Sequence, residues 1–345
     1  MRLVLVAGNT ETARIDGISA AGASPAEATH TPSADAELVS YGRLVEAPSL
    51  PRTPGGCPSP ALVTRAVREL VNVECTVVDA GIGKPTAAPT VAVGATPGRD
   101  IREATAVSNA SALFVGGRRL GSRLPDRRLV IGETVPGGTT TAMGVLRALD
   151  EDAPVSSSLS RNPIELKRSV VAKGLDASGL APGDAAGEPT TAVEAMGDPT
   201  LPVVAGLVVG ALETDKRVLL GGGTQMLAVA ALVRHADVDG RLSLATTRYL
   251  ADAVPDFTEA AAGFDADVRV TDPGFDALVD LDEPTEPVPD GGGGAGSRGP
   301  AALARFAAGE MKEGSLMGGA LALAAHADVL DEVARESVDL LAALR

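Results

Sequence analysis

The sequence predicts an α/β protein with three layers, in which helices cover both faces of a mostly parallel sheet. Short apolar runs of strand length alternate with helical segments over most of the chain. Two of these runs pass through glycine-rich turns directly into helices, at residues 129–149 and 217–235. The 345 residues can bury a large core. We therefore expect a single domain, 1–345, with Rossmann-like topology, a core over about residues 70–280, and a small helical lobe from the N-terminal and C-terminal segments.

The first half of the chain contains three apolar runs of strand length, separated by segments with helical spacing. We expect strands at Leu3–Ala7, Cys75–Asp79 and Leu129–Ile131. The spacing of apolar residues predicts helices at Ala61–Leu70, Ala104–Leu120 and Ala142–Leu149. The stretch Pro48–Pro60 carries several prolines, so we expect an extended loop there.

The second half of the chain continues the alternation. We expect helices, the second of them buried, at Ile164–Leu175, Leu201–Leu212 and Met226–His235. Strands are expected at Arg217–Leu220, Leu242–Thr246 and Val268–Thr271. Residues 283–300 are rich in glycine and proline, which favours a flexible surface loop over a substrate lid. The chain closes with a helix from Ala301 and two apolar helical stretches, Leu316–Ala327 and Val329–Leu344.

Composition limits the partners that the chain can have. The formal net charge is −15 and the sequence pI is about 4.7, which argues against nucleic acid or an anionic membrane as a partner. The acidic, lysine-poor composition favours a halophilic protein from a high-salt cytoplasm. Cys57 and Cys75 do not form a C-x-x-C pair, so we expect free thiols in a reducing compartment. With no signal peptide and no apolar run of spanning length, we expect a cytoplasmic protein.

The stretch Arg127–Leu149 has the sequence pattern of an anion-binding site. A strand run leads through the turn Gly132–Gly138 into a helix, with Thr139–Thr141 as candidate N-caps. Glycines let the backbone approach a ligand, and the helix N-terminus offers free amides and partial positive charge. Glu133 would repel a phosphate, so we place it on a ribose hydroxyl or a nitrogen base beside the phosphate. The alternative is a tight connection that binds nothing.

Other motifs fail on inspection. Gly17–Ala21 narrowly misses a nucleophile elbow, because the last position is alanine and no strand precedes it. Ala80–Pro85 resembles a dinucleotide fingerprint or a truncated phosphate-binding loop, but Pro85 and Thr86 break both patterns. The histidines are far apart and lack metal-ligand spacing, so we predict no metal and no cofactor; they are His30, His235 and His326.

Three segments carry a resemblance to a known enzyme family. They are GETVPGGTTTA at residues 132–142, GGGTQM at 221–226, and KEG followed by GGALALA within 312–324. In them the chain resembles the nicotinate-nucleotide:dimethylbenzimidazole phosphoribosyltransferases of cobalamin assembly, and most closely the archaeal branch of that family. VVDAG at 77–81, PGRDIRE at 97–103 and NPIELK at 162–167 extend the resemblance over most of the chain. The bacterial loop GEMGIGNTT and the bacterial GEG are altered here, which leaves the acceptor base open.

The resemblance implies a pentosyltransferase reaction. The ribose phosphate of nicotinate mononucleotide would move to an aromatic nitrogen base, dimethylbenzimidazole or similar, giving an α-ribotide for the lower ligand of cobalamin. Glu313 would be the general base that removes the N–H proton of the acceptor, helped by a pKa that partial burial raises. Glu133 would hold the ribose. The phosphate and the nucleotide wall would be formed by Gly137, Gly138, Thr139, Thr140, Lys167, Gly222, Gly223 and Thr224.

The resemblance also implies a symmetric homodimer, because related enzymes are homodimers and the stretch Leu316–Leu344 is rich in Ala, Leu and Val. Two alternatives remain open. The first is a nicotinamide-dependent oxidoreductase, against which the failed fingerprint at Gly81 counts. The second is a non-catalytic nucleotide-binding protein, in which Glu313 only offsets a helix dipole.

Overall fold

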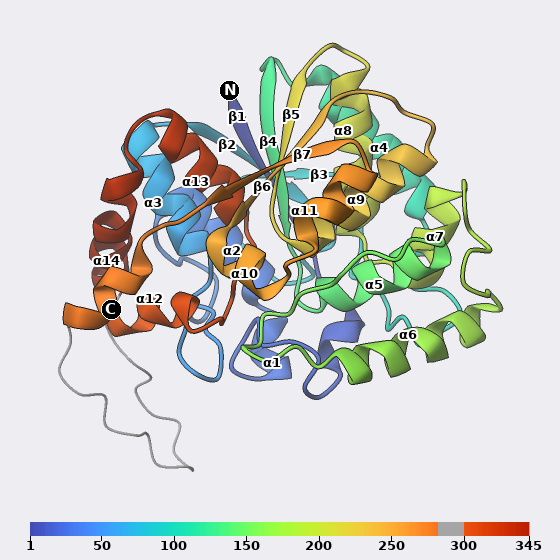
Figure 1. The fold of residues 1–345 in the computed structure, drawn as a ribbon, viewed down its shortest axis with the longest axis horizontal. Helices are drawn as coiled ribbons and strands as arrows, with labels where there is room; N and C mark the ends of the chain where they lie inside the picture. Colours follow the sequence, from blue (N-terminus) through green and yellow to red (C-terminus); the bar gives the residue numbers. More distant parts are fainter. Residues whose placement is uncertain (282–299, 345) are drawn as a thin grey trace.

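The computed structural model describes residues 1–281 and 300–344, and its core is one seven-stranded sheet (Figure 1). Every strand pair is parallel, and the strand order is β3-β2-β1-β4-β5-β6-β7. The strands are β1 (Arg2–Ala7), β2 (Glu74–Asp79), β3 (Thr90–Ala92), β4 (Arg128–Thr134), β5 (Arg217–Gly221), β6 (Leu242–Thr247) and β7 (Ala266–Thr271). The order reverses between β1 and β4, which is the topological switch point of a Rossmann-like sheet. The three-layer α/β class is therefore confirmed.

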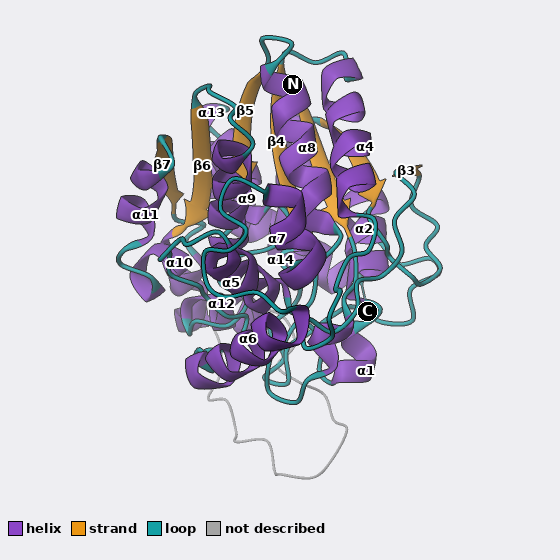
Figure 2. Cartoon of the chain, turned by 90° about the vertical axis from the view of Figure 1, so that its right-hand side faces the viewer, coloured by secondary structure: helices purple, strands orange, loops and turns teal. Residues whose placement is uncertain are grey.

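Each face of the sheet packs against a different buried helix. Leu129 of β4 belongs to the core cluster of α8 (Thr200–Leu212), whereas Val130, the next residue, packs with Leu323 of α13 (Met317–His326). Because successive side chains of a strand point to opposite faces, α8 and α13 lie on opposite sides of the sheet. Figure 2 shows helices on both sides of the strands. The expected burial of α8 is confirmed, since twelve of its thirteen residues, from Thr200 to Ala211, are buried.

The remaining helices extend these two layers. On the α8 side lie α4 (Ala110–Arg123), α9 (Thr224–His235), α5 (Gly138–Ala148), α7 (Pro189–Met196) and α11 (Phe257–Gly263). On the α13 side lie α2 (Thr31–Tyr41), α3 (Ala61–Val71) and α14 (Val333–Ala343). The shorter or peripheral helices are α1 (Pro25–Ala28), α6 (Ile164–Ser178), α10 (Arg248–Ala253), α12 (Pro300–Ala307) and the 3-10 turns Glu11–Arg14, Phe275–Leu281 and Leu330–Glu332.

Two boundaries in the central stretch differ from the sequence prediction. β4 continues to Thr134, because Glu133 and Thr134 pair in register with Val6 and Ala7 of β1. Glu133 is therefore a strand residue and not part of a glycine turn. α5 begins at Gly138, so the three threonines lie in its first turn and do not cap it. Sheet pairing here overrides the low strand propensity of glycine and glutamate.

The N-cap of α5 is Gly137, which has a φ of 79°. Glycine reaches this left-handed conformation without steric cost, and that conformation turns the chain sharply from strand to helix. A third correction concerns α4, which begins at Ala110 and not at Ala104. Residues 100–105 form a turn instead, with the amide of Arg102 bonded to the Asp100 carboxylate.

The two ends of the chain contribute to the core as well as to the periphery. β1 is a central strand between β2 and β4, so the core extends to the N-terminus and does not begin near residue 70. Helices α3, α12, α13 and α14 share a second apolar cluster that includes Phe275 and Phe306. They lie together on the left of Figure 1. Of the predicted flexible loop 283–300, residues 283–299 lie outside the described residues, and Pro300 begins α12.

None of the helices within residues 1–281 and 300–344 is long and apolar enough to cross a membrane. Packing within the chain accounts for the apolar residues of the C-terminal stretch, because α13 is buried between the sheet and α3.

Candidate active site

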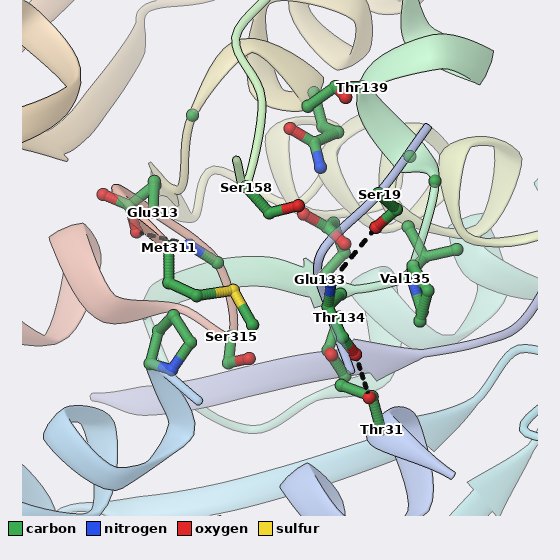
Figure 3. A pocket seen from close by; sticks show the side chains of 18 of the residues that line it. Ser19, Thr31, Glu133, Thr134, Val135, Thr139, Ser158, Met311, Glu313 and Ser315 are labelled. Atoms are coloured by element: carbon green, nitrogen blue, oxygen red, sulfur yellow. Dashed lines mark hydrogen bonds between the residues drawn. The ribbon is translucent and has the colours of Figure 1, made fainter. Parts of the chain in front are cut away.

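A polar pocket lies beyond the carboxyl ends of β4, β5 and β6, next to the switch point, where open α/β sheets bind ligands (Figure 3). The space for water-sized molecules inside it is about 60 Å³, whereas the empty space out to its open mouth is about 600 Å³. The lining comes from β4, α5, the loop before α6 and the segment before α13, and includes Glu133, Gly137, Gly138, Thr139, Ser156, Ser157, Ser158, Gly223 and Glu313.

Glu313 is held by four hydrogen bonds to its carboxylate. The amides of Gly314 and Gly318 donate to Oε1 at 3.1 and 2.9 Å, and Thr246 Oγ1 and the amide of Thr247 donate to Oε2 at 3.2 and 3.1 Å. Gly318 is in the first turn of α13, where amides lack helical partners. Burial nevertheless raises the pKa of Glu313 to about 7 against these bonds. A carboxylate with this pKa can accept a proton near neutral pH.

Gly318 allows this arrangement because α13 approaches the end of β6 closely. A Cβ at this position would lie 2.5 Å from the carbonyl oxygen of Ala245 and 2.6 Å from Oε2 of Glu313. Any side chain would displace the carboxylate or the helix. Gly318 is therefore needed because only a residue without a side chain leaves room for the Glu313 carboxylate and for the approach of α13 to β6.

The backbone around Glu313 is strained. Met311, Ser315 and Leu316 have φ values of 43°, 49° and 71°, in the left-handed region that non-glycine residues rarely adopt. Such residues cost about 1–3 kcal/mol each and persist only where neighbours hold them. Here the amide of Ser315 bonds to the carbonyl of Glu133, and Thr64 Oγ1 donates to the carbonyl of Ser315. The segment that carries Glu313 is thus fixed to β4 and to α3.

Asp35 of α2 is a fully buried carboxylate that joins three segments of the pocket. It accepts hydrogen bonds from Ser59 Oγ at 2.6 Å, Thr134 Oγ1 at 2.7 Å and Ser315 Oγ at 2.7 Å. These hydroxyls come from the loop before α3, the end of β4 and the segment before α13. Burial raises the pKa of Asp35, while the three hydroxyls lower it. One side chain thereby fixes the relative position of β4 and the Glu313 segment.

Glu133 points into the pocket from the end of β4 and is 4% exposed. Burial raises its pKa well above the ordinary value, and the nearby carboxylates of Asp198, Glu313 and Asp35 raise it further. This environment favours the neutral acid, which can donate a hydrogen bond as well as accept one. A neutral Glu133 would not repel a phosphate as its ionised form would.

The first turn of α5 lines the opposite side of the pocket. Within the described residues, the amides of Gly138 and Thr140 bond to the carbonyls of Val135 and Gly137, while no acceptor is recorded for the amide of Thr139. Thr139 also contributes its hydroxyl, which accepts from Lys167 Nζ at 2.8 Å. Lys167 is fully buried, and burial lowers its pKa to about 7, with Lys312 as a second cause. This end of the pocket therefore combines a free amide, a helix N-terminus and a buried ammonium group.

Lys312 holds the serine loop against the Glu313 segment. Its Nζ donates to the carbonyls of Ser157, Leu159 and Gly309 at 3.0, 2.7 and 2.6 Å. Burial lowers its pKa to about 8. These bonds fix residues 156–159, which form the wall between Glu313 and α5, and Figure 3 shows Ser158 between the two glutamates.

The structure brings most, but not all, of the predicted site residues to one pocket. Glu133, Gly137, Gly138, Thr139, Gly223 and Glu313 line it. Lys167 lies behind Thr139, and Thr224 accepts a hydrogen bond from the amide of Ser156 at 3.0 Å. Thr140 is fully buried inside α5, and its Oγ1 has no hydrogen-bond partner among the described residues. Gly222 and Thr140 do not line the pocket.

Sequence reasoning missed Asp35, the serines 156–158 and Ser315. Asp35 lies in the middle of a helix, and nothing in its neighbourhood distinguishes it from a solvated acid. The serines lie in a stretch that reads only as a polar loop. In the described part of the chain, no group of three or more His, Cys, Asp or Glu residues is placed to hold a metal ion.

Fold and pocket together define a Rossmann-like α/β protein whose pocket, at the carboxyl edge of the sheet, is lined by the carboxyl groups of Asp35, Glu133 and Glu313. The chain belongs to the UPF0284 family: it is 51% identical over 335 residues to a UPF0284 protein of Halobacterium salinarum, covering 97% of this chain and 95% of that one. It is 38% identical over 340 residues to a UPF0284 protein of Methanosarcina mazei, covering 97% and 92%. A scan against protein-family models found no match.

Solved structures with a similar fold come from Thermus thermophilus. One is described as nicotinate-nucleotide-dimethylbenzimidazole phosphoribosyltransferase, with a TM-score of 0.53 and 19% identity, covering 79% of this chain and 74% of that one. Another is described as CobT, with a TM-score of 0.57 and 17% identity, covering 100% and 86%. At these identities the similarity shows a shared fold.

Proposed function

We propose that this protein is a phosphoribosyltransferase that moves the ribose phosphate of nicotinate mononucleotide to an aromatic nitrogen base. The observation that carries the proposal is the carboxylate of Glu313, which lines a polar pocket, is held by four donors and has a pKa of about 7. The fold that this chain shares with two Thermus thermophilus structures supports it, as one of them is described as an enzyme of this class.

In this reaction, a ring nitrogen of the acceptor attacks the anomeric carbon of the ribose while the bond to nicotinate breaks. The bonding electron pair leaves with nicotinate and neutralises its pyridinium nitrogen. The attacking base becomes cationic and loses its N–H proton to Glu313. A base with a pKa near the working pH is suited to this transfer.

The other pocket residues take up the donor substrate. The neutral acid of Glu133 would bond to the ribose hydroxyls. The Thr139 amide and the N-terminus of α5 would bind the phosphate, and the charge of Lys167 would add to their attraction. This assignment places the two ends of the nucleotide on α5 and β4, with the acceptor on the Glu313 side.

The test of the proposed function is a product assay. Purified protein is incubated in high salt with nicotinate mononucleotide and a panel of aromatic bases, and the products are identified by mass. Release of nicotinate together with a ribotide of one base supports the proposal. No ribotide from any base, with nucleotide binding intact, would favour the non-catalytic nucleotide-binding protein. The homodimer stays a prediction of the family resemblance.

A substitution at Gly138 tests the phosphate end. A Cβ there would lie 2.7 Å from Cγ1 of Val135 and 3.1 Å from Nε2 of Gln225, both of which line the pocket. Gly138→Ala should therefore move the first turn of α5 and raise KM for nicotinate mononucleotide by about tenfold or more, since misplacement by 1 Å can cost two orders of magnitude. Steady-state kinetics measure this change.

The matched control for Gly138→Ala is Gly263→Ala, since a Cβ at Gly263 meets no atom within 4 Å and the residue is remote from the pocket. It should leave KM unchanged. An unchanged KM in a folded Gly138→Ala protein would contradict the proposal that the phosphate binds at the N-terminus of α5.

A further inference from the structure

A second pocket lies at the opposite edge of the sheet, beneath the amino ends of β4 and β5 and beside the C-terminal end of α13. Its volume is about 330 Å³. The basic side chains that line it are Arg128, Arg217, Arg269 and His326, and no acidic residue lines it. Its apolar lining comes from Leu129, Val130, Val218, Leu219, Ala322 and Leu323. In a chain with 45 Asp and Glu residues and only 30 Lys and Arg residues, this is a local reversal of charge.

The sheet register places two of these arginines side by side. Arg128 of β4 and Arg217 of β5 are paired positions on neighbouring parallel strands. Neighbouring strands are about 4.8 Å apart, and paired residues point to the same face. That face is the one covered by α13, since Val130 two positions later packs with Leu323. Like charges placed opposite each other in a sheet are destabilising.

The guanidinium groups of Arg128, Arg217 and Arg269 form no hydrogen bond or ion pair with any residue in 1–281 or 300–344. Other arginines of this chain do find carboxylates: Arg2 bonds Asp126, and Arg241 bonds Asp267 of the neighbouring strand. No carboxylate of the described residues therefore neutralises the three arginines around the pocket. An anion between them would relieve the repulsion.

We propose that this pocket binds a small molecule that carries a phosphate group on an apolar body. Arg128 and Arg217 are paired on neighbouring strands, so both guanidinium groups can reach one oxyanion, and planar guanidinium groups form bidentate hydrogen bonds with phosphate. Arg269 adds a third cation from β7. The side chains of Val130, Leu219 and Leu323, which lie on the face covered by α13, provide the surface for the apolar part. The C-terminus of α13 contributes about half a negative charge, which three guanidinium groups outweigh.

Isothermal titration calorimetry with inorganic phosphate and with phenyl phosphate, at constant ionic strength, tests this site. Phenyl phosphate should bind the wild-type protein at least threefold more tightly than inorganic phosphate. The double variant Arg128→Gln/Arg217→Gln should weaken phenyl phosphate binding by tenfold or more. Any phosphate bound at α5 is the same in all proteins compared, and therefore forms a common background.

The matched control is Arg119→Gln/Arg123→Gln, which makes the same change of net charge on exposed residues of α4, on the other side of the sheet. Its affinity should equal that of the wild type. Equal affinities for the two double variants would overturn the proposal, as would the absence of any preference for phenyl phosphate. Circular dichroism checks that each variant is folded, and Arg217→Gln alone repeats the test if the double variant is not.

Discussion

Replacing Glu313 with glutamine should lower kcat by roughly 10²- to 10⁴-fold, the usual contribution of a general base. Glutamine keeps the size of the side chain, and its one oxygen can still accept from the amides of Gly314 and Gly318. Its NH2 group can donate to the hydroxyl of Thr246, but glutamine cannot take up a proton. KM for nicotinate mononucleotide should change little, because the donor phosphate and ribose contact α5 and β4 in our proposal. Steady-state kinetics with an acceptor whose N–H is neutral at the assay pH give both constants.

Glu310→Gln is the matched control for this experiment. This variant removes the same negative charge at a position three residues before Glu313. The carboxylate of Glu310 bonds to Arg305 and does not line the pocket. This variant should keep the kcat of the wild type. If Glu313→Gln turned over within a few-fold of the wild type, Glu313 would be a capping residue, and Glu133 or a water molecule would become the candidate base.

The pH profile of kcat/KM provides an independent check on Glu313. A base with a pKa of about 7 must be ionised to act, so kcat/KM should fall about tenfold for each pH unit below 7. The pH dependence that Lys167 contributes runs in the opposite direction. Its pKa is also about 7, and it loses its positive charge as the pH rises. This loss should weaken phosphate binding and raise KM at alkaline pH. In Glu313→Gln the acidic limb should disappear and the alkaline limb should remain.

The fold could be predicted from the sequence because its signals are local. Apolar runs such as Leu3–Ala7 and Arg217–Leu220 have strand length, and each is followed by turn residues. What local pattern does not contain is the pairing partner. Glu133 and Thr134 belong to β4 because β1 lies alongside them, and β1 is separated from them by more than a hundred residues. The boundary between strand and loop is therefore set by tertiary contacts.

The site was predictable only where backbone geometry leaves a mark in the sequence. Gly137 is needed for a left-handed turn and Gly318 for a close approach of α13 to β6, and both stand in glycine motifs. The assignment of Lys167 to the site and the role of Glu313 as a base came from the family resemblance. No local sequence pattern identifies Asp35 as a site residue, because its hydrogen-bond partners come from segments distant in the sequence. The sequence alone does not distinguish a buried aspartate from an exposed one.

Replacing Asp35 with asparagine should lower kcat by roughly 10- to 100-fold, although we place Asp35 outside the proton transfer. Thr134 and Ser315 both donate to Oδ2 of Asp35, and Ser59 donates to Oδ1. Asparagine offers one oxygen where the carboxylate offers two, so with its NH2 group in place of Oδ2 both Thr134 and Ser315 would lose their acceptor. The strained segment around Ser315 would then relax and move Glu313, and a misplacement of about 1 Å can cost this much in rate.

The pH profile separates this positioning role from a loss of stability. The amides of Gly314 and Gly318 lower the pKa of Glu313, so a displaced segment should raise that pKa and move the acidic limb of kcat/KM above pH 7. The matched control is Glu37→Gln on the same helix, since Glu37 is also fully buried and accepts from the amides of residues 45–47 and 87, away from the pocket. Both variants should lower the free energy of unfolding, by about 1.5–3 kcal/mol for each lost bond to a charged group. Only Asp35→Asn should lower kcat and shift the limb, and an unshifted limb with a wild-type kcat would reduce Asp35 to a structural residue.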